Sequence, residues 1–187
     1  MREIIPGNLI MLQSYRGEHI HPLREAVLAS IPELPRYETW AHATYSLNDA
    51  EDYVTWWRQA QESGQAYYFA VEEPETGLLL GSCGLSGLIM DHRRASLGFW
   101  IRQDYTSRGY ATDAAQALIT WGFQERGLNR IELEIAVGNK ASRRVAEKLG
   151  AVFEGVLRQR LLLPEGPTDT AIYALLSEEW RPPQLPD

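Results

Sequence analysis

Hydrophobic residues recur every three or four positions in four segments of the chain, a spacing that predicts amphipathic helices. The segments cover residues 18–30, 46–64, 111–127 and 141–149. Ser46 stands where the second helix begins, and its hydroxyl can cap the free backbone amides there. In the third segment small and aliphatic residues form one stripe, while Asp113 belongs to a polar stripe that we expect to face the other way, toward solvent.

Apolar runs, and alternation of apolar with polar residues, predict strands in most of the remaining sequence. These segments cover residues 8–14, 66–71, 78–85, 95–102, 131–137, 152–163 and 170–176. The three between 66 and 102 fit an antiparallel meander, and the last two fit an antiparallel pair. The strand–helix–strand unit over residues 95–137 requires a parallel pair. We therefore expect a mixed α/β (α+β) fold, with a mostly antiparallel sheet of six to seven strands and a crevice where the parallel strands part.

Length and charge narrow the class of protein. The chain has 187 residues and a formal net charge of −7, from 18 basic and 25 acidic side chains. This size fits a single domain over residues 1–180, followed by a proline-rich tail over residues 181–187. The acidic balance argues against nucleic acid as a partner. No apolar run is long enough to cross a membrane and the N-terminus lacks the apolar core of a signal peptide, so we expect a cytoplasmic location. The four histidines show no metal-ligand spacing, and Cys83 alone cannot form an internal disulfide.

The loop between the strand at 95–102 and the next helix is a candidate phosphate site. Gly109 permits a tight turn, and the amides at the helix start, from about Gly109 to Asp113, would point at one spot. Aligned amides and the helix dipole bind phosphate, and Arg108 adds positive charge. The loop lacks both the Walker Gly-Lys-Ser/Thr and the three spaced glycines of a dinucleotide fingerprint. The alternative is a plain turn in which Gly109 only relieves the backbone.

Asn139 and Ser142 follow the strand at 131–137, where the last helix begins. Asn139 occupies the position of an N-cap, three residues before Ser142. One interpretation is capping alone. The other places both side chains at the mouth of the crevice, next to the candidate phosphate loop.

Four segments occur in a fixed order along the chain. They are Leu97-Gly98-Phe99-Trp100-Ile101, Arg108 to Ala114, Asn139 to Gly150, and Glu154-Gly155. Together they resemble the GNAT superfamily of acyl-CoA-dependent N-acyltransferases, and most closely its RimJ/RimL-like branch. The resemblance covers about residues 8–180 in the order of elements. It implies a mixed sheet with a central, splayed parallel pair and helices on both faces.

The resemblance also implies an acetyl-CoA-dependent N-acetyltransferase that passes the acetyl group directly to an amine. The residues that it assigns to the cofactor are Phe99, Trp100, Ile101, Arg102, Arg108, Gly109, Tyr110, Ala111, Thr112, Asn139 and Arg143. The pyrophosphate would lie on the loop and helix start, and the pantetheine arm along the strand. A backbone N–H of Phe99 or Trp100 would face the thioester oxygen. Asn139 would hold the arm and Ser142 would protonate the departing thiolate, so these two are the expected catalytic residues.

Two of these implied roles have structural alternatives. Trp40, in the connection between the first two helices, would form a wall of the acceptor pocket or simply pack. Arg143 belongs to a basic cluster that would contact cofactor phosphates or face solvent.

The sequence departs from the family pattern in its candidate base. Ser96 stands where many relatives carry a glutamate, and Thr106 stands where the phosphate loop usually begins with Gln or Arg. Asp91 and His92 could replace the base or form a solvated turn. The missing glutamate keeps a second interpretation open, a non-catalytic acyl-CoA-binding or sensing module, and a nucleotide-phosphate binder is a third.

The acceptor is expected to be an amine, either a protein or peptide N-terminus or a small molecule. An α-amine has a reference pKa of about 7.7–8.0 and a lysine side chain about 10.4, so an α-amine is favoured where no strong base is found. Relatives often dimerise, and a homodimer is left open.

Overall fold

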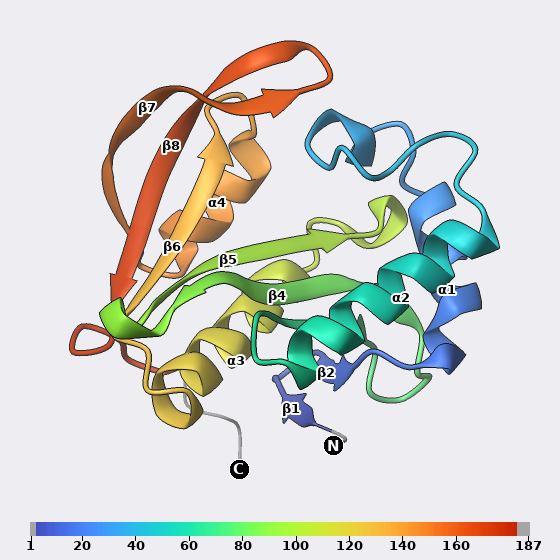
Figure 1. Cartoon of the computed structure of the whole chain (residues 1–187), viewed down its shortest axis with the longest axis horizontal. Helices are drawn as coiled ribbons and strands as arrows, with labels where there is room; N and C mark the ends of the chain where they lie inside the picture. Colours follow the sequence, from blue (N-terminus) through green and yellow to red (C-terminus); the bar gives the residue numbers. More distant parts are fainter. Residues whose placement is uncertain (1–2, 183–187) are drawn as a thin grey trace.

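An eight-stranded mixed sheet organises the chain, in the order β1-β2-β3-β4-β5-β6-β8-β7 (Figure 1). This computed structural model describes residues 3–182, so most of the predicted tail lies outside the described residues. The strands are β1 (Ile4–Pro6), β2 (Met11–Ser14), β3 (Tyr67–Glu72), β4 (Leu79–Ile89), β5 (Arg94–Ile101), β6 (Arg130–Ala136), β7 (Val152–Leu163) and β8 (Gly166–Leu176). The predicted count of six to seven strands is therefore too low by at least one.

Four helices cover the two faces of this sheet, as the resemblance implied. They are α1 (Ile20–Leu28), α2 (Leu47–Glu62), α3 (Tyr110–Glu125) and α4 (Lys140–Lys148). Leu23 of α1 and Val54 of α2 bury their side chains with Trp100 of β5, whereas Leu118 of α3 and Ala146 of α4 belong to the core on the opposite face. The two pairs of helices therefore enclose the strands between two hydrophobic layers (Figure 1). No helix within residues 3–182 has the length and apolar content needed to traverse a bilayer.

A local signal fixes the start of α2 where the sequence predicted it. Ser46 caps α2, because its hydroxyl accepts the backbone N–H of Asp49 at 3.2 Å. The carboxylate of Asp49 accepts the backbone N–H of Ser46 at 2.7 Å in return. This reciprocal capping box satisfies amides that the helix itself leaves free.

The N-terminal segment differs from the prediction of one strand over residues 8–14. Two short strands, β1 and β2, form instead, and the turn between them is bound by Asp113 of α3. The Asp113 carboxylate accepts the backbone N–H groups of Asn8, Leu9 and Ile10 at 3.1, 2.7 and 3.2 Å, and the Asn8 side-chain amide at 3.2 Å. Asp113 is only 6% exposed, so its assignment to a solvent-facing stripe is wrong. A carboxylate is stable in this position because four donors replace the water it loses.

The predicted parallel pair, β5 with β6, is confirmed, and it is short. Only three residue pairs join the strands, and the last is Ser96 with Glu132. Beyond that pair β5 continues to Ile101 and β6 to Ala136 without pairing to each other. The C-terminal halves of the two strands therefore splay apart, which opens the sheet near its centre (Figure 1).

Candidate active site

A cavity of about 690 Å³ fills the opening between the two splayed strands. Six parts of the chain meet around it: the end of β5, the end of β6, the α1–α2 connection, the loop and first turn of α3, helix α4 with the residue before it, and the end of β7. The lining includes Phe99, Trp100, Ile101, Leu133, Glu134, Glu33, Glu38, Gly109, Tyr110, Ala111, Thr112, Asn139, Ser142, Arg144 and Lys148. The sequence-predicted residues of β5, of the α3 start and of the α4 start are thus brought together in one place.

One edge of β5 is free along this cavity. The backbone N–H of Arg102 donates to a carbonyl of β4 at 2.8 Å. Because N–H directions alternate along a strand, the backbone N–H of Trp100 also points toward β4. The carbonyl of Arg93 instead accepts amides at the start of β6. The backbone N–H and C=O groups of every second residue from Arg93, including Phe99, therefore point toward the β6 side. Phe99 lies past the last β5–β6 pair, and its N–H therefore points into the opening. Of the two residues proposed for the oxyanion contact, the geometry favours Phe99.

The start of α3 provides free backbone donors at one end of the cavity. Gly109 is the N-cap, with φ of +92°, a left-handed conformation that glycine adopts without a steric penalty. The first bond of the helix runs from the N–H of Asp113 to the carbonyl of Gly109, at 3.0 Å. The amides of residues 110–112 precede it and have no acceptor within the helix. This arrangement suits an anion, since the donors and the helix dipole point the same way.

Two arginines that the resemblance assigned to the cofactor lie beside the cavity without lining it. The Arg102 guanidinium forms two bonds to Asp104, at 2.7 and 2.9 Å. The Arg108 guanidinium lies over the ring of Tyr105, 4.7 Å from its centroid, and donates to the carbonyl of Asp104 at 3.2 Å.

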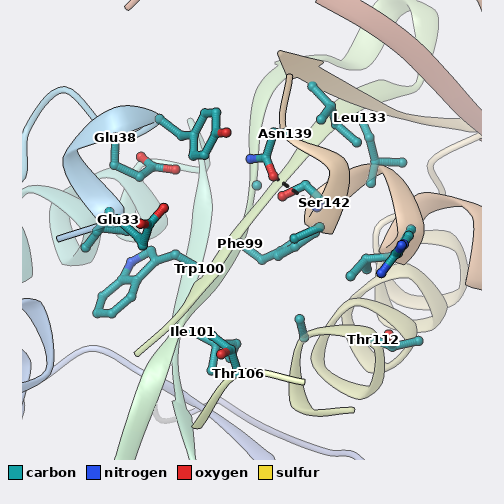
Figure 2. A pocket seen from close by; sticks show the side chains of 18 of the residues that line it. Glu33, Glu38, Phe99, Trp100, Ile101, Thr106, Thr112, Leu133, Asn139 and Ser142 are labelled. Atoms are coloured by element: carbon teal, nitrogen blue, oxygen red, sulfur yellow. Dashed lines mark hydrogen bonds between the residues drawn. The ribbon is translucent and has the colours of Figure 1, made fainter. Parts of the chain in front are cut away.

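The start of α4 separates the two roles considered for Asn139 and Ser142. The Asn139 side-chain oxygen accepts the backbone N–H of Ser142 at 3.1 Å, so Asn139 is the N-cap, as predicted. Its amide nitrogen points away from that bond, into the opening (Figure 2). The cap uses only the backbone N–H of Ser142, so the Ser142 hydroxyl, at the cavity wall, can bind a ligand or transfer a proton.

The basic residues of α4 divide between two faces. Arg143 donates its Nε to the hydroxyl of Tyr173 at 3.0 Å and does not line the cavity. Arg144 and Lys148 line the cavity instead. Neighbouring residues of a helix point about 100° apart, which explains why the sequence signal for a basic cluster did not identify the member that faces the site.

The α1–α2 connection forms the wall opposite Asn139 and Ser142, with Glu38 pointing into the opening (Figure 2). Glu38 accepts the indole N–H of Trp40 at 2.8 Å. Burial raises the pKa of Glu38 to about 7, although the bond from Trp40 acts in the opposite direction. Trp40 itself packs among aromatic rings and is not part of the lining. Its ring centroid lies 4.8 Å from that of Tyr53 and 5.9 Å from that of Trp100.

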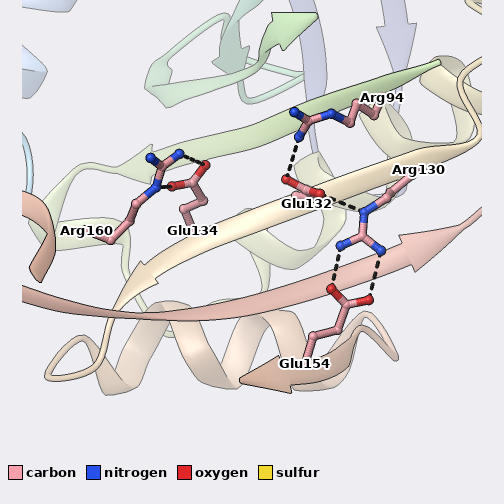
Figure 3. Close-up of polar contacts among 6 residues, drawn as sticks. All are labelled: Arg94, Arg130, Glu132, Glu134, Glu154 and Arg160. Carbon is pink, nitrogen blue, oxygen red and sulfur yellow. Dashed lines mark hydrogen bonds and ion pairs between the residues drawn. The ribbon is translucent and has the colours of Figure 1, made fainter. Parts of the chain in front are cut away.

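A ladder of ion pairs crosses the open face of β5, β6, β7 and β8 beside the cavity (Figure 3). Glu132 accepts Arg94 at 3.3 Å and Arg130 at 2.7 Å, and Arg130 also binds Glu154. Along the same face Glu134, which lines the cavity, accepts Arg160 at 3.0 Å. These carboxylates have their charges balanced within the fold.

The substitutes considered for the missing glutamate do not lie in the cavity. Asp91 and His92 are exposed in the β4–β5 hairpin, at the N-terminal end of β5, whereas the cavity follows its C-terminal half. Ser96 is the last residue of β5 that pairs with β6 and also does not line it. Within residues 3–182 no group of three or more His, Cys, Asp and Glu side chains is arranged to hold a metal ion.

Comparison with known proteins identifies this architecture. The family model described as "Acetyltransferase (GNAT) domain" matches residues 10–152. The chain belongs to the GNAT acetyltransferase family. That assignment agrees with the resemblance carried by the four sequence segments.

Individual GNAT relatives match different shares of the chain. YdaF of Bacillus subtilis (strain 168), a candidate ribosomal N-acetyltransferase, is 38% identical over 104 residues, which is 56% of this chain and 57% of the relative. This chain therefore matches little more than half the length of that curated protein. The crystal structure of a "Probable acetyltransferase" is 27% identical, covers 95% of this chain and 99% of its own, and has a TM-score of 0.84. RimL, a ribosomal L7/L12 alpha-N-protein acetyltransferase in complex with coenzyme A, has a TM-score of 0.86 at 22% identity, covers 93% of this chain and 98% of its own, and shows the fold alone.

Glu38 was assigned no role from the sequence, although the connection that carries it was expected to form a wall of the pocket. Glu38 carried only a weak signal, a carboxylate set between Tyr37 and Trp40 in a connection with no periodicity. Its position in the cavity depends on how the α1–α2 connection folds back over β5, which no local pattern specifies.

Proposed function

We propose that this GNAT chain transfers the acetyl group of acetyl-CoA directly to the α-amine of a peptide or protein N-terminus. The observation that carries the proposal is the opening between β5 and β6, which joins a free strand edge, a helix start rich in free amides, and a wall of different chemistry across the gap. The name of YdaF, a candidate ribosomal N-acetyltransferase, supports a protein acceptor.

The residues on one side of the cavity suit coenzyme A. The free amides of residues 110–112 suit the diphosphate, and Arg144 and Lys148 add positive charge nearby. The free edge of β5 suits the amide-bearing pantetheine arm, which can bond to it as a further strand would. The thioester carbonyl would then lie near the N–H of Phe99, which stabilises the oxyanion that forms during attack.

The chemistry requires no enzyme nucleophile. A neutral amine forms a bond to the acetyl carbon, and the carbon–sulfur bond then breaks. Two protons leave the amine on the way from ammonium to amide: one must be removed before attack, and the other can pass to the departing thiolate. In this proposal the Ser142 hydroxyl, which lines the cavity, donates to that thiolate and regains a proton from the nitrogen.

Thiol release tests this function directly. The full chain is incubated with acetyl-CoA and a panel of short peptides with free α-amines, with Nα-blocked lysine peptides and with small amines, and free coenzyme A is measured by a thiol reagent. We expect release with α-amine peptides, and mass spectrometry should find one acetyl group on the N-terminal residue. Tight coenzyme A binding without thiol release from any amine would instead favour the sensing module. Protection by ATP rather than coenzyme A in a thermal-shift assay would favour the nucleotide-phosphate binder.

Replacing Ser142 by alanine separates the proton role from the helix cap. Ser142→Ala keeps the backbone N–H that Asn139 binds, so the unfolding temperature should stay unchanged, while kcat should fall about 10- to 100-fold because the thiolate leaves without a proton. Asn139→Ala is the matched variant: it removes the cap and should lower the unfolding free energy by about 1 kcal/mol. Steady-state kinetics and thermal unfolding of both variants check this, and a normal kcat for Ser142→Ala would exclude the serine as the acid.

A further inference from the structure

The carboxylates around the cavity differ in how their charges are balanced. Glu33 pairs with Arg36 at 3.0 Å and Glu134 pairs with Arg160 at 3.0 Å. Within residues 3–182, Glu38 is the one cavity-lining carboxylate without an arginine, lysine or histidine at ion-pair distance. Its partner is the neutral indole N–H of Trp40. Glu38 is half-buried, and a partly desolvated carboxylate that no cation balances is a favourable site for a cation that enters the cavity.

We propose that Glu38 binds the α-ammonium group of the acceptor and removes its proton, as the general base for which Ser96 provides no carboxylate. This inference rests on the proposed function and names the residue that prepares its substrate. Glu38 comes from a part of the chain different from that of the glutamate expected on β5, so the same chemical role would be filled from the opposite wall.

The geometry supports attack from that wall. Figure 2 shows the Glu38 carboxylate across the opening from Asn139 and Ser142, so an amine held by Glu38 would approach the acetyl carbon from the face opposite the cofactor residues. The indole of Trp40 is held by packing on Tyr53 and Trp100, which fixes the direction of its N–H and thereby the carboxylate.

The other ionisable groups near Glu38 do not compete for the proton. Tyr53 of α2 and Tyr68 of β3 are close enough to feel its charge, and burial raises the pKa of both phenols, Tyr53 to about 12 and Tyr68 further. On its own connection Tyr37 and the paired Glu33 face the same cavity, and across the opening stand the paired Glu134 and the cationic Arg144. Among these groups, Glu38 is thus the carboxylate that can take a proton from the acceptor amine.

The proton balance is complete without another reactant. The ionised Glu38 takes one proton from R–NH₃⁺, the free amine attacks the acetyl carbon, and Glu38 returns that proton to solvent after product release. The raised pKa of Glu38, about 7, suits this task. It is about one unit below that of an α-amine, so proton transfer is unfavourable by only about tenfold, against more than about a thousandfold for a lysine side chain. The base therefore also favours an α-amine as acceptor.

Glu38→Gln provides the central test, because glutamine keeps the size and the bond from Trp40. With an α-amine peptide that the wild-type chain acetylates, kcat should fall about 100-fold or more, while acetyl-CoA affinity and the unfolding temperature stay unchanged. The wild-type kcat should rise with pH through about 7, and the residual rate of the variant should instead follow the acceptor's own pKa of about 7.7–8.0. Glu25→Gln is the matched control and should stay within about threefold of wild type, because Glu25 is an exposed residue of α1 that does not line the cavity.

Trp40→Phe tests the positioning role of Trp40 through the pH dependence of kcat, which would not change if Trp40 only supported the fold. Phenylalanine keeps a ring for packing and removes the N–H that lowers the pKa of Glu38, so the acid limb of the pH–kcat profile should shift to higher pH. A lower rate with an unshifted limb would contradict the positioning role of Trp40.

The kinetic results for the wild-type chain and the Glu38→Gln variant distinguish failure of the Glu38 role from failure of the proposed acetyltransferase function. Wild-type activity together with an equally active Glu38→Gln variant, with the same acid limb, overturns the role of Glu38 and leaves the acetyltransferase intact. A wild-type chain that binds coenzyme A and releases no thiol with any amine overturns both.

Discussion

Replacing Gly109 by aspartate is expected to weaken coenzyme A binding by about 100-fold or more. The new carboxylate would stand at the N-cap of α3, where it can accept the free amides of residues 110–112 and so occupy the donors that the proposal assigns to the diphosphate. It would also bring negative charge to the same place. The loss of two charge-assisted hydrogen bonds, at about 1.5–3 kcal/mol each, accounts for an effect of this size. Isothermal titration with coenzyme A measures it.

Gly109→Ala is the matched control for the backbone. Its methyl group would meet the same strained φ of +92° and lie about 3.4 Å from Leu9, but it carries neither charge nor acceptor. We expect this variant to bind coenzyme A within about fivefold of wild type, with a stability loss of about 1 kcal/mol. If Gly109→Asp kept wild-type affinity, the diphosphate would have to lie elsewhere, and the roles of the α3 amides would fail with it.

Signals that lie close together in the sequence predicted most of this fold. The capping box at Ser46 fixed the start of α2, and the alternation over residues 131–137 located β6 to within one residue at each end. The parallel pair followed from the need for a crossover between β5 and β6. Each of these three features depends on residues a few positions apart, or on the handedness of a single connection. Each can therefore be predicted without knowing how the rest of the chain folds.

Contacts between distant segments were beyond such signals. Asp113 reads as a surface residue on a helical period, yet it binds amides 103 to 105 positions earlier in the chain. Glu38 and Trp40 likewise depend on how an irregular connection folds over β5. The candidate site has the same limit. The resemblance indicated that the α1–α2 connection would form one wall, but not that Glu38, rather than Trp40, would line the cavity.

Asp113→Ala is expected to lower the unfolding free energy by about 3 kcal/mol or more. The substitution removes a buried carboxylate that accepts the backbone N–H groups of residues 8–10, and hydrogen bonds to a charged group contribute about 1.5–3 kcal/mol each. For a chain of this size the unfolding temperature should fall by about 6–12 °C. Urea denaturation and thermal unfolding measure both quantities. Gln116→Ala, one turn further along α3, should change stability by less than about 0.5 kcal/mol.

The same substitution should also affect the proposed cofactor site, because the β1–β2 turn that Asp113 binds carries Leu9, whose side chain lies near Gly109 at the start of α3. Loosening that turn removes a support from the amides that precede the first bond of the helix. Coenzyme A should therefore bind about two- to fivefold more weakly to the folded Asp113→Ala variant, a few tenths of a kcal/mol up to about 1. An unfolding free energy within 1 kcal/mol of wild type would contradict this account, since it would mean that water replaces the carboxylate at all three amides.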